Sequence, residues 1–96
     1  MISNKKLKFE IEDELRRLIH SGEILDVSLE RGKDSDSDDV IFIHVVFDNK
    51  SKQLDARETS VVTRHVRNRL SKIGESSFPL FYYIAKSEAG KLSAAS

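Results

Sequence analysis

Two segments of the chain carry apolar residues at helical spacing. From Asn4 to Ser21, apolar residues recur three or four positions apart among charged neighbours, which predicts a helix with one buried stripe. The same spacing returns from Ala56 to Ile73, where Asp55 is a candidate N-cap and Glu58 completes an aspartate variant of the capping box. A glycine follows each segment and is expected to end the helix. The predicted buried stripes are Leu7, Ile11, Leu15, Leu18 and Ile19 in the first helix and Thr59, Val62, Val66, Leu70 and Ile73 in the second.

Three further segments have the patterns of strands. Glu23 to Arg31 alternates with period two, so it predicts a strand with one wet face. Val40 to Asp48 is apolar on both faces, which is typical of a central strand. Phe78 to Ala85 predicts a third strand, and its Pro79 belongs near the start of the strand or on an edge because proline donates no ladder hydrogen bond. The apolar face of the first strand consists of Leu25, Val27 and Leu29.

The segment between the first two strands is strongly acidic. Gly32 to Asp39 holds four aspartates and no apolar residue, so we expect the mobile tip of an antiparallel hairpin. Asp34, Asp36 and Asp38 alternate as at the start of a calcium loop, but the glycine and the bidentate glutamate of an EF-hand are missing. We therefore predict a solvated acidic turn rather than a tight calcium site.

The order of elements is α-β-β-α-β, which predicts a single α+β domain over residues 1–85. A strand-helix-strand connection crosses over right-handed, so the third strand should be parallel to the second. The predicted sheet is therefore three-stranded and mixed, in the order 1-2-3, with both helices on one face. The tail over residues 86–96 is rich in alanine, serine and glycine and is expected to be disordered.

Because both helices cover one face, the other face of the predicted sheet is open. Phe42, His44 and Val46 of the second strand lie on this open face. Alternate residues of the third strand lie there too, and these are either Phe81 and Tyr83 or Leu80 and Tyr82. An uncovered apolar sheet face is typical of an interaction surface. The alternative is that the first helix or the tail covers it. The predicted interaction face consists of Phe42, His44, Val46, Phe81 and Tyr83.

Composition and charge narrow the function classes. The chain has 16 lysine and arginine residues and 16 aspartate and glutamate residues, so no net charge attracts nucleic acid or acidic membranes. The lack of cysteine excludes a disulfide framework and a thiolate site, and fits a reducing compartment. No apolar run approaches the roughly 20 residues of a membrane helix, and the first residues lack the apolar stretch of a signal peptide. We therefore predict a cytoplasmic chain without a membrane partner.

No motif for catalysis or cofactor binding is recognisable. His20, His44 and His65 lack the spacing of a zinc motif. The chain also lacks a nucleophile elbow, a Walker loop and a dinucleotide fingerprint. We predict that the protein is not an enzyme and that it uses no cofactor and no metal.

The second predicted helix carries a basic strip. The segment from Arg64 to Lys72 contains four cations and no acid, and several of its arginines share the face away from the buried stripe. Such a strip binds phosphate groups, or it complements the helix dipole and pairs with nearby acids. The candidate RNA-binding residues are Arg57, Arg64, Arg67 and Lys72.

The α-β-β-α-β order, with Arg67-x-x-Leu70 and Phe78-Pro-Leu-Phe-Tyr-Tyr83, resembles the ribosome-binding factor A family of bacterial KH-type proteins. The likeness runs from about Glu14 to Ala85 and implies binding to the small ribosomal subunit. Where that family has an Ala-x-Gly kink, this chain has Val62-Thr-Arg64. The same order also resembles the soluble C-terminal dimerisation domain of cation-efflux transporters, which implies pairing through the sheet. One topology therefore leaves two functions open.

Two functions follow from these features. The first is a non-catalytic protein-interaction or self-association module, such as a homodimer, that uses the open sheet face and Phe9, which lies off the buried stripe. The second is a KH-like module that binds RNA or the ribosome through the basic helix. Zero net charge favours the first, because nucleic-acid binders usually carry a basic surplus.

Overall fold

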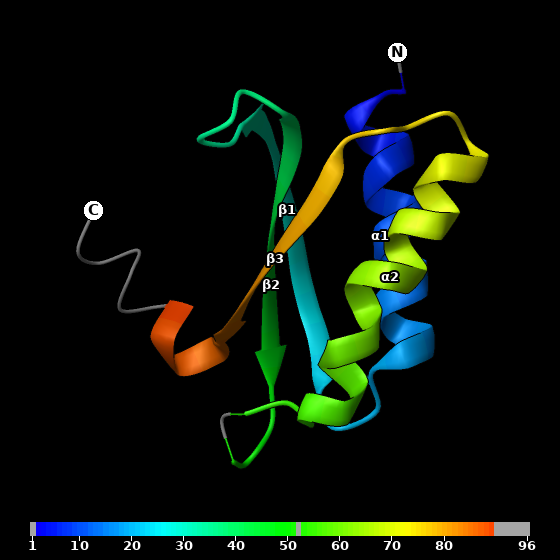
Figure 1. Cartoon of the computed structure of the whole chain (residues 1–96). Helices are drawn as coiled ribbons and strands as arrows, with labels where there is room; N and C mark the ends of the chain where they lie inside the picture. The colour runs from blue at the N-terminus through cyan, green and yellow to red at the C-terminus, as the bar shows by residue number, and fades with distance from the viewer. Residues whose placement is uncertain (1, 52, 90–96) are drawn as a thin grey trace.

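The computed structural model describes residues 2–51 and 53–89 and contains the five predicted elements in the predicted order. Two helices, α1 (Asn4–Leu18) and α2 (Ala56–Lys72), lie on one face of a sheet formed by β1 (Glu23–Lys33), β2 (Asp39–Asp48) and β3 (Phe78–Ala85) (Figure 1). The strand order is β1-β2-β3, with β1 antiparallel and β3 parallel to β2. The predicted α+β fold, the mixed sheet and the placement of both helices are thus confirmed.

The chain continues beyond β3. Residues 86–89, which belong to the tail expected to be disordered, form a helical turn that lies away from α1 and α2 (Figure 1). The rest of that predicted tail, 90–96, lies outside the described residues. None of the described helices combines the length and the apolar character that crossing a membrane requires.

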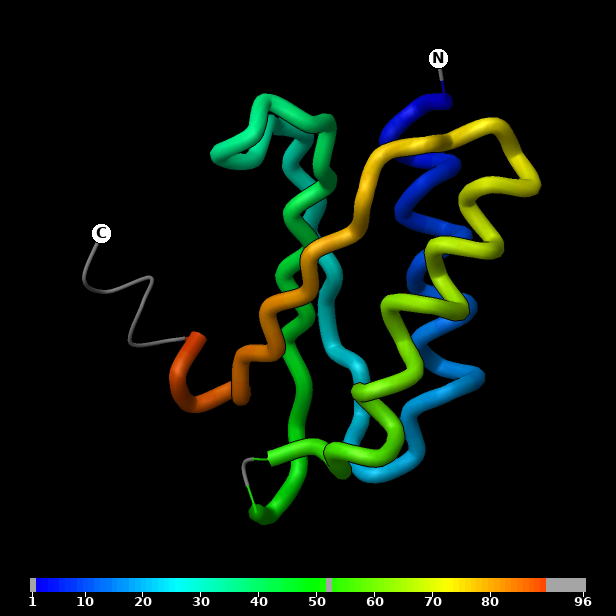
Figure 2. Tube along the Cα trace, viewed as in Figure 1, coloured from blue at the N-terminus to red at the C-terminus, as the bar shows by residue number. Residues whose placement is uncertain are grey.

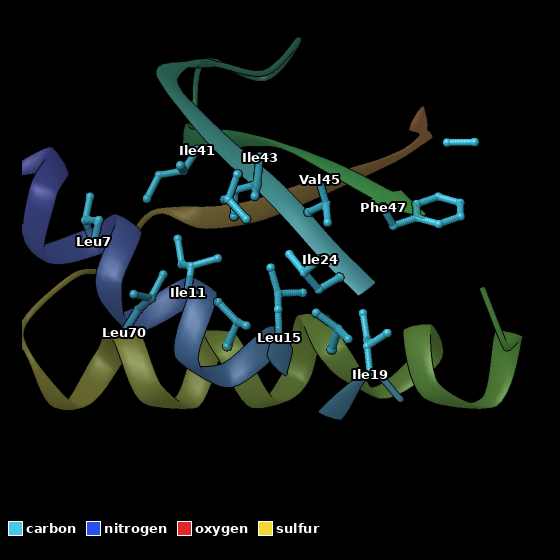
Figure 3. Close-up of a cluster of buried hydrophobic side chains, with 14 residues drawn as sticks. Leu7, Ile11, Leu15, Ile19, Ile24, Ile41, Ile43, Val45, Phe47 and Leu70 are labelled. Atoms are coloured by element: carbon cyan, nitrogen blue, oxygen red, sulfur yellow. The ribbon is translucent and has the colours of Figure 1, made fainter. Parts of the chain in front are cut away.

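The hydrophobic core fills the layer between the helices and the sheet. Ile41, Ile43 and Val45 of β2 point toward Ile11 and Leu15 of α1 (Figure 3). Alternate residues of β2 face this layer because successive side chains of a strand point to opposite sides. The two predicted helical stripes form the helical side of the core, with Leu18, Thr59 and Ile73 only half-buried at its margin. The buried cluster consists of Leu7, Ile11, Leu15, Ile19, Ile24, Val27, Ile41, Ile43, Val45, Phe47, Val62, Val66, Leu70 and Ala85.

The glycines after the two helices serve different purposes. Gly74 follows α2 with φ +87°, a left-handed conformation that glycine adopts without strain. α1 ends at Leu18, earlier than predicted, and Gly22 does not have a positive φ. A Cβ at Gly22 would lie 3.2 Å from the carbonyl oxygen of Asp48, so this glycine allows the chain to pass close to the end of β2.

A bulge in β1 changes which residue faces the core. The pairing with β2 shifts between Ile24 and Asp26, and Leu25 is the extra residue. Ile24 is buried, whereas Leu25 is 40% exposed. The prediction that Leu25 shares the buried face of Val27 and Leu29 is therefore wrong, because strict alternation does not continue through a bulge.

A tight acidic turn joins β1 to β2. The strands extend to Lys33 and resume at Asp39, and the turn lies at the end of the sheet where β3 begins (Figure 2). The carboxylate of Asp34 accepts hydrogen bonds from the amides of Asp36 and Asp38, each at 2.9 Å. Such an aspartate turn gives the segment a defined conformation. The mobility expected of this segment stays a prediction.

The start of α2 is tied to the loop after α1. Asp55 caps the helix, as predicted, by accepting a hydrogen bond from the amide of Arg57 at 2.8 Å. Glu58 does not complete the predicted capping box. Its carboxylate instead accepts hydrogen bonds from the amide of His20 at 3.1 Å and from the hydroxyl of Ser21 at 2.6 Å, and the Ser21 hydroxyl accepts one from the amide of Asp55 at 2.9 Å. The bond from Ser21 lowers the pKa of Glu58. A local cap is thus replaced by a tertiary link.

A partly buried ion pair joins β1 to the turn before β3. Nη2 of Arg31 donates to Oε1 of Glu75 at 2.8 Å and to the carbonyl oxygen of Ile2 at 3.1 Å. Glu75 is buried and also accepts a hydrogen bond from the amide of Ser77 at 3.2 Å. The hydrogen bond from Arg31 outweighs the effect of burial and lowers the pKa of Glu75 to about 2.

This low pKa predicts a loss of stability in acid. Because the pKa of Glu75 falls from its usual 4.5 to about 2 on folding, its contribution is complete above pH 4.5 and is lost as the pH falls toward 2. We expect Glu75→Gln to unfold with about 2 kcal/mol less free energy than the wild type at neutral pH. Urea unfolding across this pH range should show the two free energies converging, and a constant difference would contradict the prediction.

Candidate functional site

The face of the sheet opposite the helices carries a continuous apolar and aromatic surface. Residues paired across neighbouring strands point to the same side of a sheet, and in the register of β2 with β3, His44 lies beside Tyr82. Neither α1 nor α2 covers this side (Figure 1). We call this surface the open face, and it consists of Phe42, His44, Val46, Leu80, Tyr82 and Ile84.

Aromatic rings meet at the centre of the open face. The ring of Tyr82 stacks on His44 with centroids 5.2 Å apart, and the ring of Phe42 lies 6.5 Å from Tyr82. Phe42 also covers Gly32 of β1, where a Cβ would lie only 2.7 Å from Cε2 of the ring. Tyr82 is 47% exposed. The glycine therefore leaves room for Phe42, and Tyr82 presents the most exposed ring of the three.

Two residues predicted for this face lie on the other side of the sheet. Phe81 and Tyr83 pair in register with Ile43 and Val45, which belong to the core. Their rings lie 6.0 Å apart and pack against that core, and burial raises the pKa of the Tyr83 hydroxyl. Assigning Phe81 and Tyr83 to the interaction face is therefore wrong. The other parity of alternation places Leu80 and Tyr82 there.

The margin of the open face along β1 is polar and acidic. Asp26, Ser28 and Glu30 pair with the three open-face residues of β2, so they point to the same side, and all three are exposed. A polar margin beside an apolar centre is the common composition of a protein interface.

The structure separates the four candidate RNA-binding residues of α2. Arg57 pairs with Asp55 at 3.3 Å. Arg64 and Arg67 form no ion pair within residues 2–51 and 53–89, and they line an open cleft of about 600 Å³ between α2 and the start of β3. Lys72 lines a different cleft, beside α1. Only Arg64 and Arg67 are thus brought together.

Arg67 is held against the first residue of β3. Its guanidinium carbon lies 5.0 Å from the centroid of the Phe78 ring, within the range of a cation-π contact. Phe78 is 38% exposed. The two residues lie on consecutive elements and meet because the turn after α2 brings the chain back, so the periodicity of neither element indicated this contact.

Arg69 belongs to the same basic strip but lies between the helices. Its guanidinium group contacts three carboxylates of α1. Nη1 lies 2.8 Å from an oxygen of Asp13 and 3.2 Å from an oxygen of Glu14, and Nε contacts Glu10. A hydrogen bond from Arg17 lowers the pKa of Glu14, and Arg69 adds to the effect. This arginine therefore joins α2 to α1. The acidic residues of the first predicted helix were the only sequence signal for it.

The acidic turn brings three carboxylates together at the tip of the hairpin. Oxygen atoms of Asp34, Asp36 and Asp38 lie within 4.8 Å of one another, and all three side chains are exposed. One oxygen of Asp34 already accepts two backbone hydrogen bonds. The conformation of the turn is explained by these bonds, and we assign no metal site to it.

Comparisons with known proteins add no relative. No protein-family model, no curated protein and no solved structure matches this chain. The open face and the cleft beside α2 are therefore the features of the chain that bear on its function.

Proposed function

We propose that this chain is a non-catalytic protein-interaction module that pairs with a second copy of itself through the open face. The observation that carries this proposal is the row of apolar and aromatic side chains on the side of the sheet opposite α1 and α2, with Tyr82 at 47% exposure. We further propose a cytoplasmic location, which a chain without cysteine fits.

Burial of the open face supplies the driving force for pairing. Removing apolar surface from water stabilises a complex by about 25 cal/mol per Å². A domain of this size buries a smaller share of its surface than a large one, so added burial has a large relative effect on its stability. Pairing would also make the apparent stability depend on protein concentration.

The acidic margin along β1 favours one arrangement of the two copies. A twofold axis parallel to the strands would place β1 of one copy opposite β3 of the other. Asp26 and Glu30 of one copy would then face uncharged residues of β3 in the other copy. The alternative, in which β1 faces β1, would bring the like charges of the two copies together, and these would repel each other.

Tyr82→Glu tests the proposal. We expect the wild type to scatter light as a dimer at high micromolar concentration and the variant as a monomer, because the change places a charge at the centre of the apolar contact. Tyr82 is 47% exposed, so the variant should keep its fold, which circular dichroism would check.

Phe9→Glu is the matched control. Phe9 is 64% exposed on α1, which lies on the opposite side of the sheet (Figure 1), so the structure separates it from the open face with which the sequence grouped it. Its replacement should therefore leave the dimer unchanged. A Tyr82→Glu variant that stays dimeric, or loss of the dimer in Phe9→Glu alone, would remove the open face from the interface. A wild type that is monomeric at high micromolar concentration would overturn self-association.

A further inference from the structure

The cleft between α2 and the start of β3 gathers two arginines, Arg64 and Arg67, that have no acidic partner among the described residues. Elsewhere in α2 the arginines are held by acids, Arg57 by Asp55 and Arg69 by the carboxylates of α1. Arg64 and Arg67 lie one helical turn apart and form no ion pair within the part of the chain that the structure describes. Two neighbouring guanidinium groups in a cleft favour an anionic ligand.

Phe78 holds one of these cations in place. The guanidinium of Arg67 lies on the ring of Phe78, with 5.0 Å between its central carbon and the ring centroid. This contact restricts the side chain while leaving it charged and without an acidic partner, so less freedom is lost when a ligand binds. The planar guanidinium and the aromatic ring together also suit a planar group of the ligand.

The remaining lining supports an anion rather than a cation. Asn68 of α2 and Ser76 of the following turn add neutral hydrogen-bonding groups. The acid in the lining, Glu75, is bound by Arg31 at 2.8 Å and by the amide of Ser77 at 3.2 Å. The charge of Glu75 is thus compensated within the protein, so Arg64 and Arg67, which form no ion pair within residues 2–51 and 53–89, give the cleft its charge.

The size of the cleft and the number of cations distinguish a small ligand from a nucleic-acid strand. A volume of about 600 Å³ lies within the range of small-molecule sites. An RNA strand is held by a series of cations along its phosphates. Here Arg57 is paired, Lys72 lies in another cleft, and the formal net charge is zero. We propose that Arg64, Arg67 and Phe78 form a binding site for a mononucleotide, with the phosphate on the arginines and the base against the ring.

Titration calorimetry of the full chain with AMP tests this site, with adenosine and inorganic phosphate as partial ligands. We expect AMP to bind more tightly than either by about ten-fold or more, because each partial ligand lacks one half of the contacts. Arg64→Ala and Arg67→Ala should each weaken AMP binding about ten-fold, since each removes a charge-assisted hydrogen bond. Phe78→Leu should weaken AMP by a larger factor than inorganic phosphate, because phosphate loses only the restraint on Arg67 whereas AMP also loses the ring.

Arg57→Ala is the matched control on the same helix, and it should leave AMP binding unchanged. Arg67→Lys, which keeps the charge and loses the planar group, should bind phosphate but bind AMP less tightly than the wild type. Undetectable AMP binding, or inorganic phosphate binding as tightly as AMP, would overturn the proposal. So would a short oligoadenylate that binds far more tightly than AMP with a steep salt dependence and sensitivity to Arg57→Ala, because that result indicates an RNA strand.

Discussion

Arg69→Leu should lower the free energy of unfolding by about 3 kcal/mol, because it removes the cation that three carboxylates of α1 share. The side chain of Glu14 is 6% exposed and that of Arg69 is 25% exposed, so water compensates only partly for the lost contact. Leucine retains apolar packing between the helices, so the decrease in the free energy of unfolding comes mainly from the lost ion pairs with α1. Urea unfolding at neutral pH measures it.

Arg16→Leu provides the comparison for this charge effect. Arg16 pairs with Glu12 at 2.9 Å, but its side chain is 54% exposed, and exposed pairs contribute about 0–1 kcal/mol. The free energy of unfolding lost on Arg69→Leu should also be smaller in a Glu14→Gln background, because one of the three side chains that contact the arginine is then uncharged. Equal losses for the two arginines would show that Arg69 does not join the helices as described.

Ile43→Ala should destabilise the chain by about 3 kcal/mol. Ile43 has 0% exposure at the centre of β2, and its side chain points into the layer between the sheet and the helices (Figure 3). The change removes buried apolar contacts and leaves a cavity that hydrogen-bonded neighbours on both sides of β2 restrict from closing. Urea unfolding gives the loss directly.

Leu25→Ala is the control for this core substitution. Leu25 is the extra residue of the β1 bulge and is 40% exposed, so its truncation should cost less than about 1 kcal/mol. A loss as large as that of Ile43→Ala would mean that Leu25 belongs to the core and that the register of β1 is different.

The sequence was sufficient for the order of elements and the arrangement of the sheet. The helical spacing of Leu7, Ile11 and Leu15 reports directly on burial, because the repeat of a helix matches the repeat of its buried face. The apolar residues on both faces of β2 indicated its central place in the sheet. The right-handed crossover then determined the direction of β3. These features depend on local periodicity and on one general rule of chain topology.

The candidate site was predicted only in part. The residues of β2 could be divided between the two faces of the sheet. β3 is apolar at nearly every position, so its sequence does not show which alternate residues face the core, and Phe81 and Tyr83 were assigned to the wrong face. The contact of Arg67 with Phe78 depends on how the turn after α2 is folded, and the partners of Arg69 lie on α1, which is distant in the sequence. Tertiary pairing of this kind leaves no local pattern.

The parallel pairing of β3 with β2 determines when the open face comes into existence during synthesis. β1 and β2 are joined by a short turn and can pair as soon as both have been made, whereas β3 reaches the sheet only after the whole of α2. Tyr82, the most exposed ring at the centre of the open face, arrives with that last strand. A nascent chain that has not reached β3 therefore lacks half of the open face and leaves one edge of β2 unpaired, so the arrival of β3 completes that face and closes that edge together.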